Sequence, residues 1–474
     1  MAQDSWQERR ALGRAARERI PRGAHDAIGD IDRDPVDLLR ASSEGRVGAL
    51  IPLRYGRMLA SPFTFYRGSA ILQAHDLAAT PDSGIDIQIC GDCHLSNFGG
   101  FATPERALIF DLNDFDETAP GPWEWDLKRL VASFTIAGRH LGHGAVAADE
   151  FAFLAARSYQ SHMREYAEMS VLDLWYERIT FERMYDAVLT DDARRRIKRG
   201  IERASRRTHE TMLPKLADRT GDAWRIRDAP PAVFHIHGKS TLIDKDDSWM
   251  TLKGSREEIF GALMQRYVAT LTPERAQLLS QFTLQDIAFK VVGVGSVGTR
   301  CLVLLLTDHH GKPLFLQMKE ASTSVVARYA KARSDDERPQ HDGQRVVLGQ
   351  RLMQAATDPF LGWATGPIGR TLYIRQLRDM KVSAELETFD SQAFREYAAL
   401  CGWALARAHA KSGGHAPEIS GYLGNSDRMA EVLVRYGRGY ADRVEKDYEQ
   451  FRAACRDGKL EARTDADMAA DFAP

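Results

Sequence analysis

Two short acidic segments, each directly after an apolar run, limit what this chain can fold into more than any other feature. The first reads Gly91-Asp92-Cys93-His94-Leu95-Ser96-Asn97-Phe98 and follows I-D-I-Q-I at residues 85–89. The second reads Phe110-Asp111-Leu112-Asn113-Asp114-Phe115-Asp116 and follows A-L-I-F at residues 107–110. Both runs predict strands, so each acidic segment leaves a strand end. Carboxylates in such positions are not expected in the core.

The spacing inside these segments is typical of phosphoryl transfer. Asp92 and Asn97 have the D-x-x-x-x-N spacing of the catalytic Asp and the metal-binding Asn in kinases. Asp114-Phe115-Asp116 is close to the D-F-G motif, whose Asp holds magnesium. The chemistry requires such residues because magnesium prefers oxygen ligands, and because a carboxylate can take the proton of the acceptor hydroxyl.

Here the chain resembles aminoglycoside and choline phosphotransferases. Gly91 to Asn97 resembles their H-G-D-x-H-x-x-N loop, and Asp114 to Leu127 resembles their I-D-F-x-D…W-D-L-A segment. The resemblance implies that Asp92 is the catalytic base, that Asn97 and Asp114 are magnesium ligands, and that Asp126 is a structural anchor. Asp116 is the candidate for a second metal. Cys90 departs from the pattern, since those enzymes usually carry a His there.

Over residues 34–442 the chain also resembles the bacterial DUF2252 family, whose name records an undefined function. The resemblance implies a fold relationship and no particular substrate. The segments that carry it are Arg54-Tyr55-Gly56-Arg57-Met58 and residues 91–99, 113–130, 293–298 and 317–321.

A glycine-rich stretch, Gly293-Val294-Gly295-Ser296-Val297-Gly298, follows the strand-like residues F-K-V-V at 289–292. A dinucleotide-binding fold would continue with a helix, and a kinase glycine loop with a second strand. The next residues, T-R-C-L-V-L-L-L-T at 299–307, favour a strand, and a third follows at 314–321. The kinase arrangement therefore fits best, with the dinucleotide fold and a plain tight hairpin as alternatives.

Lys319, late in the third strand, is then the residue expected to reach the nucleotide phosphates. Kinases pair this Lys with a Glu on the next helix. The helix expected near residues 343–356 has Gln344, Gln350 and Gln354 but no Glu. The sequence therefore leaves the partner of Lys319 open between one of these Gln residues and Glu320.

The order of these parts is inverted, because the first lysine of the chain is Lys128, beyond both acidic segments. We expect an α+β, protein-kinase-like two-lobe fold in circularly permuted order. Residues 1–59 form an N-terminal helical arm, 60–285 the helical lobe with the catalytic and metal loops, 286–380 the β-rich nucleotide-gripping lobe, and 381–474 the helices that complete the helical lobe. Lys319 should then lie in the cleft of Asp92 and Asp114, and the helix ending near His409 should pack beside the strand before Gly91.

Composition and charge limit the number of packed units, the cellular compartment and the kinds of partner that are expected. With 474 residues, 44% hydrophobic and 27% charged, the chain is expected to be globular with two or three packed units. Its net charge of −2 argues against a nucleic-acid partner, and the basic run Arg194 to Arg199 is interpreted as a solvated helix face. No signal peptide and no membrane-spanning run is recognised, so a cytoplasmic protein without a membrane partner is expected.

The expected activity is an ATP- and Mg²⁺-dependent phosphotransferase acting on a hydroxyl of a small molecule or a protein. Asp92 would act as base, Asn97, Asp114 and Asp116 at the metal, and Lys319 with Gly293, Gly295, Ser296 and Gly298 on the nucleotide. Adenylyl transfer uses the same parts, and a pseudokinase-like module that only binds nucleotide is the other alternative. Cys90 and Cys93 form a C-x-x-C pair without a second pair, which favours coincidence over a metal or redox site.

Overall fold

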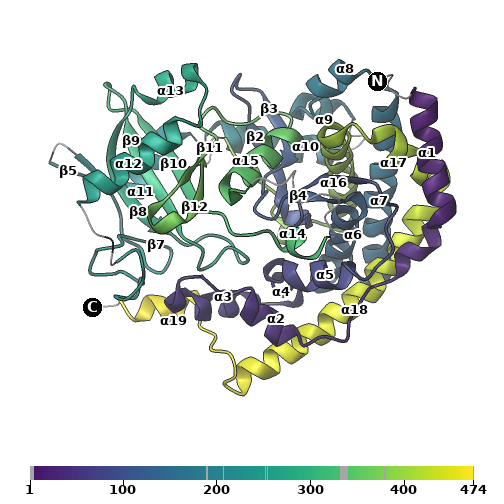
Figure 1. The fold of residues 1–474 in the computed structure, drawn as a ribbon, viewed down its shortest axis with the longest axis horizontal. Coiled ribbons are helices and arrows are strands. Elements are labelled where there is room, and N and C mark those ends of the chain that lie inside the picture. Colours follow the sequence, from purple (N-terminus) through teal and green to yellow (C-terminus); the bar gives the residue numbers. More distant parts are fainter. Residues whose placement is uncertain are drawn as a thin grey trace.

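The computed structural model describes residues 5–187, 191–206, 208–221, 223–250, 252, 255–330, 340–377 and 380–472. It is a mixed α+β structure with a sheet-rich part and a helix-rich part side by side (Figure 1). Among the described residues, no helix has the length and apolar character that crossing a membrane requires.

The sheet-rich part contains a six-stranded sheet in the order β11-β12-β10-β9-β8-β7. All its neighbouring strands are antiparallel. The strands are β7 (Val233–Phe234), β8 (Thr283–Lys290), β9 (Cys301–Thr307), β10 (Pro313–Glu320), β11 (Gly362–Thr365) and β12 (Thr371–Gln376). β9 is buried along its whole length because both faces of the sheet are covered, and this explains its unbroken apolar sequence.

Alternation along the strands divides the sheet between two cores. Leu302, Leu304 and Leu306 face a core shared with α12 (Arg256–Val268) and α13 (Pro273–Leu279). Val303, Leu305 and Phe315 face a smaller core shared with α11 (His209–Leu216), β5 (Ala217–Thr220) and β6 (Ala223–Ile226).

The helix-rich part is built around α6 (Trp123–His140), α7 (Ala145–Glu168), α16 (Ser391–Gly413) and α18 (Arg428–Arg456), which share one large core. α6 is buried from Trp123 to Gly138. The other helices are α1 (Trp6–Arg19), α2 (Pro35–Ala41), α3 (Ile51–Met58), α4 (Pro62–Gly68), α5 (Ala70–Leu77), α8 (Val171–Tyr176), α9 (Phe181–Ala187), α10 (Asp191–Ser205), α14 (Val325–Tyr329), α15 (Asp342–Met353), α17 (Ala416–Leu423) and α19 (Asp465–Ala470).

Two small sheets in the helix-rich part position the acidic segments. β1 (Asp86–Ile89) pairs with β4 (Ala119–Pro122), and β13 (Val382–Ser383), β2 (Phe98–Ala102) and β3 (Leu108–Leu112) form a three-stranded sheet. The strands predicted before the two acidic segments are thus present as β1 and β3.

The predicted segment boundaries differ from the packing. β7, α12 and α13 lie within residues 60–285, yet their side chains belong to the core of the sheet. The first 59 residues contribute to both cores, because Ala16 and Leu39 enter the helical core while Val47, Leu50 and Leu53 enter the core of the sheet. The spacing of hydrophobic residues predicts where helices form, but it does not predict against which core each helix packs.

Candidate functional site

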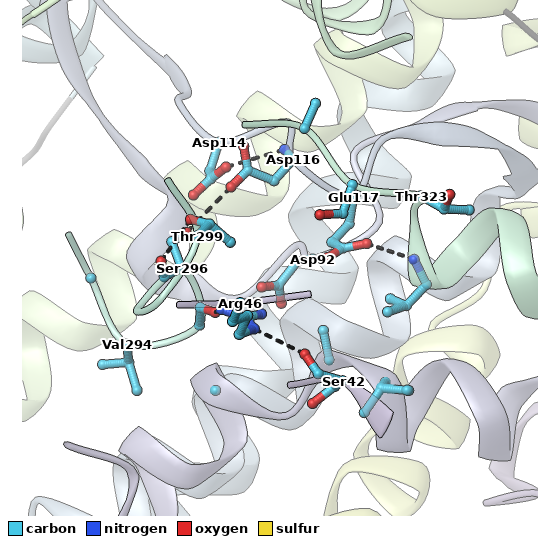
Figure 2. Close-up of a pocket in the computed structure, with 18 of the residues that line it drawn as sticks. Ser42, Arg46, Asp92, Asp114, Asp116, Glu117, Val294, Ser296, Thr299 and Thr323 are labelled. Carbon is cyan, nitrogen blue, oxygen red and sulfur yellow. Dashed lines mark hydrogen bonds between the residues drawn. The ribbon is translucent and has the colours of Figure 1, made fainter. Parts of the chain in front are cut away.

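The two acidic segments and the glycine-rich stretch meet at one cavity of about 290 Å³. Figure 2 shows Asp92, Asp114, Asp116 and Glu117 on one side and Ser296 and Arg46 facing them. Of the residues predicted for the site, those that line the cavity are Asp92, Asn97, Asp114, Asp116, Gly293, Gly295 and Ser296. Lys319 reaches the same place by binding Asp116.

The loop that carries Asp92 is hydrogen-bonded to α6. Asp126, in the first turn of α6, accepts hydrogen bonds from the backbone N–H groups of Cys90 (2.8 Å) and Gly91 (2.9 Å). His409 of α16 lies 3.0 Å from the same carboxylate through Nε2. The prediction that this helix packs beside the strand before Gly91 is therefore confirmed, and Asp126 anchors the loop.

Gly91 is required in this loop for two reasons. Its φ of +82° lies in the left-handed region, where side chains are strained. A Cβ at this position would also lie 2.2 Å from the backbone oxygen of Glu117. Only glycine therefore lets the Asp92 loop approach the second acidic segment this closely.

Asp92 is bound to a buried arginine that the sequence did not single out. Arg129, on α6, donates from Nε to Oδ1 of Asp92 at 2.8 Å and also binds the backbone oxygen of Tyr66 at 2.8 Å. Burial raises the pKa of Asp92, and the charge of Arg129 opposes that rise. The second carboxylate oxygen of Asp92 lies 3.8 Å from Nε2 of His94. Asp92 is thus fixed in orientation at the wall of the cavity.

Asn97 and Asp114 offer the oxygen ligands that a divalent cation prefers. The side-chain nitrogen of Asn97 donates to the backbone oxygen of Asp92 at 2.8 Å, which orients the amide. Burial raises the pKa of Asp114, and the charge of Asp116 raises it further. A carboxylate destabilised in this way gains from a cation, so the donor set fits magnesium.

Asp116 has a different environment, because its carboxylate is already hydrogen-bonded on both oxygens. Oδ2 binds the ammonium of Lys319 and Oδ1 accepts from the hydroxyl of Tyr373 at 2.7 Å. Burial would raise the pKa of Asp116, but the charge of Lys319, the hydrogen bonds from Lys319 and Tyr373 and the charge of Arg375 together lower the pKa below its ordinary value. Asp116 is therefore a partner of Lys319 here rather than an open metal ligand.

The partner of Lys319 is thus neither a Gln of α15 nor Glu320. Burial disfavours its charge, but Asp116 and its other negative neighbours raise the pKa of Lys319 above the ordinary value. Its ammonium also donates to Ser296 Oγ at 2.9 Å. Glu320 binds Arg300 and Arg370 instead. A contact across 203 positions is set by the fold and has no local signal in the sequence.

The glycine-rich stretch joins β8 to β9, which pair as antiparallel neighbours. The dinucleotide alternative is therefore wrong, because a helix would have to follow the glycines. Arg46 donates to the backbone oxygens of Gly295 (2.7 Å) and Val297 (2.6 Å), and Arg57 donates to that of Gly293 (2.7 Å). Arg46 and Arg57, both before α4 in the sequence, thus fix the glycine-rich loop by binding the loop's backbone carbonyl groups.

Two further charged groups at the cavity were missed or left undecided by the sequence. Burial raises the pKa of Glu117 to about 7, and Glu117 accepts a hydrogen bond from the N–H of Val325 at 2.6 Å. Arg67 lines the cavity, and its buried Nε has no hydrogen-bond acceptor within the described part of the chain. Arg54, by contrast, is structural, because it binds Ser43 Oγ and the backbone oxygen of Gly68.

Cys90 and Cys93 are free, buried thiols close to Asp126. Burial raises the pKa of both thiols, which makes them unreactive at neutral pH. Asp126 is already hydrogen-bonded to two backbone N–H groups and to His409, so the pair is interpreted as core packing.

Comparison with known proteins gives a family and no function. A family model described as "Uncharacterized protein conserved in bacteria (DUF2252)" matches residues 46–454. No curated protein and no solved structure matches the chain.

Proposed function

We propose that this chain, which belongs to the DUF2252 family, is an ATP- and magnesium-dependent, kinase-like phosphotransferase acting on a hydroxyl of a small molecule or a protein. The observation that carries the proposal is the meeting of Lys319, Ser296 and Asp116 above the cavity that Asp92, Asn97 and Asp114 line. Three distant segments supply these residues, and each has the residue type that phosphoryl transfer needs at its position.

The strand order supports a protein-kinase-like fold. The glycine loop joins β8 and β9, Lys319 lies on the adjacent strand β10, and the short helix α14 and then α15 follow along the chain. Protein kinases have the same succession of glycine loop, strand with lysine and helix. Here this succession follows the catalytic segment in sequence instead of preceding it, so we infer a circularly permuted two-lobe kinase fold.

The chain's own residues account for each role in the reaction. Magnesium, held by Asn97 and Asp114, would neutralise charge on the phosphates. Lys319 would leave Asp116 for the phosphates, and Ser296 and the loop N–H groups would bind them from above. Asp92 would orient the acceptor hydroxyl and take its proton. Arg67 would face the transferred phosphoryl group, since its guanidinium forms no ion pair among the described residues.

The pseudokinase and adenylyl-transfer alternatives keep the same binding residues. α15 carries no Glu, and Arg345 of this helix instead binds the backbone oxygens of Asp116 (3.0 Å) and Thr118 (2.6 Å). The helix is thus fastened to the metal segment without the usual Lys–Glu pair. This observation is the one that favours a binding module.

Labelled ATP distinguishes the three activities. The protein, Mg²⁺ and a heat-treated bacterial extract are incubated with ATP labelled at either the γ or the α phosphorus. Phosphoryl transfer moves only the γ label and leaves ADP, whereas adenylyl transfer moves only the α label. Asp92→Asn should strongly slow the transfer, and Asp442→Asn, which changes an exposed carboxylate outside the cavity, should not. ATP binding without transfer of either label would overturn the proposal in favour of a binding module.

A further inference from the structure

A second, larger cavity of about 850 Å³ lies between α9, α10, α16 and the β13-β2-β3 sheet. Its lining is mainly apolar and includes Phe110, Phe181, Ile197, Val382, Leu400 and Trp403. The ring of Trp403 stacks on His162 with centroids 4.9 Å apart. Small-molecule sites typically have this volume and this apolar character.

The arginines that line this cavity all lie on α10. Arg196 and Arg203 are neutralised by Glu396 (2.6 Å) and Glu385 (2.8 Å). Arg199 lies between them on the same helix, lines the cavity and is exposed. Within the described part of the chain it forms no ion pair. The basic run that the sequence suggested to be a solvated face therefore contributes Arg199, which has no ion pair among the described residues, to an apolar cavity.

We propose that this cavity binds a small amphiphilic monoanion, an apolar body with a single carboxylate-like head that pairs with Arg199. The apolar lining excludes a highly charged ligand, because its charges would lose water without partners. One free guanidinium provides for one anionic group. The volume of about 850 Å³ favours a small molecule over a protein partner.

The cavity also touches the catalytic loop. Tyr397, in its wall, donates its hydroxyl hydrogen to the backbone oxygen of Leu95 at 2.7 Å, between Asp92 and Asn97. β2 begins directly after Asn97 and contributes Gly99 and Gly100 to the lining. A ligand in this cavity therefore lies directly behind the residues of the first site, although its binding does not depend on the function proposed for them.

Isothermal titration of the full chain with dodecanoate, below the micelle-forming concentration, tests this proposal. One saturable site is expected. Arg199→Glu should weaken dodecanoate binding about tenfold or more, the usual value of a charge-assisted contact. The same variant should gain affinity for dodecyltrimethylammonium. Lys198→Glu, an exposed neighbour that does not line the cavity, should change neither affinity by more than about twofold.

A cavity-filling variant separates loss of the site from loss of the fold. A Cβ at Gly200 would lie 3.6 Å from Phe181 and 3.7 Å from Val382, which is ordinary contact distance. Gly200→Leu therefore places a side chain in the cavity and also improves helix propensity. It should abolish dodecanoate binding, whereas Gly261→Leu on α12, with open space around it, should not. Absence of saturable binding, unchanged binding in Gly200→Leu, or equal losses in Lys198→Glu and Arg199→Glu would each overturn the proposal.

Discussion

At the scale of single residues, Asp92 combines exposure to the cavity with a fixed orientation. Arg129 holds one oxygen at 2.8 Å, and Asn97 and His94 bind the backbone of the same loop. A general base requires such positioning more than it requires a large pKa shift. The buried guanidinium below Asp92 keeps the carboxylate directed at the cavity.

Asp92→Asn should lower the rate of γ-phosphoryl transfer from ATP by roughly 10² to 10⁴, the usual contribution of a positioned general base. ATP affinity should change little, because Asp92 acts on the acceptor. Rates are measured with labelled ATP and affinities by calorimetry. A wild-type rate in this variant would remove Asp92 from the mechanism. A lower melting temperature alone would not, because Arg129 also loses its charge partner.

The sequence predicted which acidic residues meet but not what holds them. Asp92, Asn97 and Asp114 could be predicted because they have the spacing of known motifs and their segments follow predicted strands. Arg129, Arg46 and Glu117 could not, because their contacts join segments whose proximity only the tertiary fold creates. Arg129 did carry one signal, since it lies three positions after Asp126 and therefore on the same side of α6.

At the scale of elements, the glycine loop depends on residues that precede the first acidic segment. Arg46 binds two of its carbonyl groups, and the N–H of Val47 donates to the backbone oxygen of Gly298 at 2.8 Å. The backbone oxygens of Gly295, Val297 and Gly298 thus all accept hydrogen bonds from Arg46 and Val47. The loop is fixed in place before any ligand arrives.

Arg46→Ala should therefore weaken ATP binding in the presence of Mg²⁺ and destabilise the loop by about 1.5–3 kcal/mol, the usual value of hydrogen bonds to a charged group. Calorimetry gives the affinity, and hydrogen exchange of residues 293–298 gives the local stability. Arg40→Ala provides the matched control, because Arg40 forms an exposed pair with Asp37. Equal exchange rates in both variants would show that Arg46 does not hold the loop.

A histidine links the edge of the large sheet to β8. His235 lies 2.9 Å from Asp286 through Nε2 and 2.8 Å from Asp228 through Nδ1. The hydrogen bond to Asp286 raises the pKa of His235 above its ordinary value, burial opposes this shift, and Asp228 adds to it. The protonated form is therefore favoured in the folded chain.

A raised pKa in the folded state means that this stabilisation is complete below the unfolded pKa, about 6.5. It is lost as pH rises through the higher folded pKa. The melting temperature of the wild type should therefore fall more steeply above pH 6.5 than that of His235→Gln. His309→Gln, at an exposed turn, should follow the wild type. Parallel curves for all three proteins would contradict the assignment.

At the scale of the whole molecule, the C-terminal segment supports the cavity from outside through α3. α19 packs against α3, Met468 enters the core of the sheet, and the N–H of Arg463 donates to the backbone oxygen of Pro52 at 2.9 Å. Asp465 binds Arg57 at 2.6 Å, and Arg57 holds the glycine loop. Figure 1 shows α19 and α3 side by side beneath the sheet.

Ending the chain at Leu460 should lower the free energy of unfolding by about 2 kcal/mol through exposure of the Met468 pocket alone. It should also weaken ATP binding, because Arg57 loses Asp465. Chemical denaturation and calorimetry measure the two effects. Met468→Asp in the full chain should reproduce the loss of stability while ATP affinity changes less. A truncated chain with unchanged stability would show that α19 contributes nothing to the fold.

The inverted order of the parts is the whole-molecule feature on which the account depends. The sequence predicted it from two observations, that neither a lysine nor a G-x-G-x-x-G motif precedes the acidic segments. In the structure the ammonium of Lys319 binds Asp116. In the proposed reaction the same ammonium binds the nucleotide phosphates. Nucleotide binding must therefore exchange one partner of Lys319 for another.

The most direct test is a crystal structure with a non-hydrolysable ATP analogue and Mg²⁺. The account predicts phosphate oxygens on the ammonium of Lys319 and on the N–H groups of residues 293–298. It also predicts a magnesium ion on the side-chain oxygens of Asn97 and Asp114. A nucleotide bound elsewhere, or an unbroken Lys319–Asp116 pair with the analogue at saturating concentration, would contradict it.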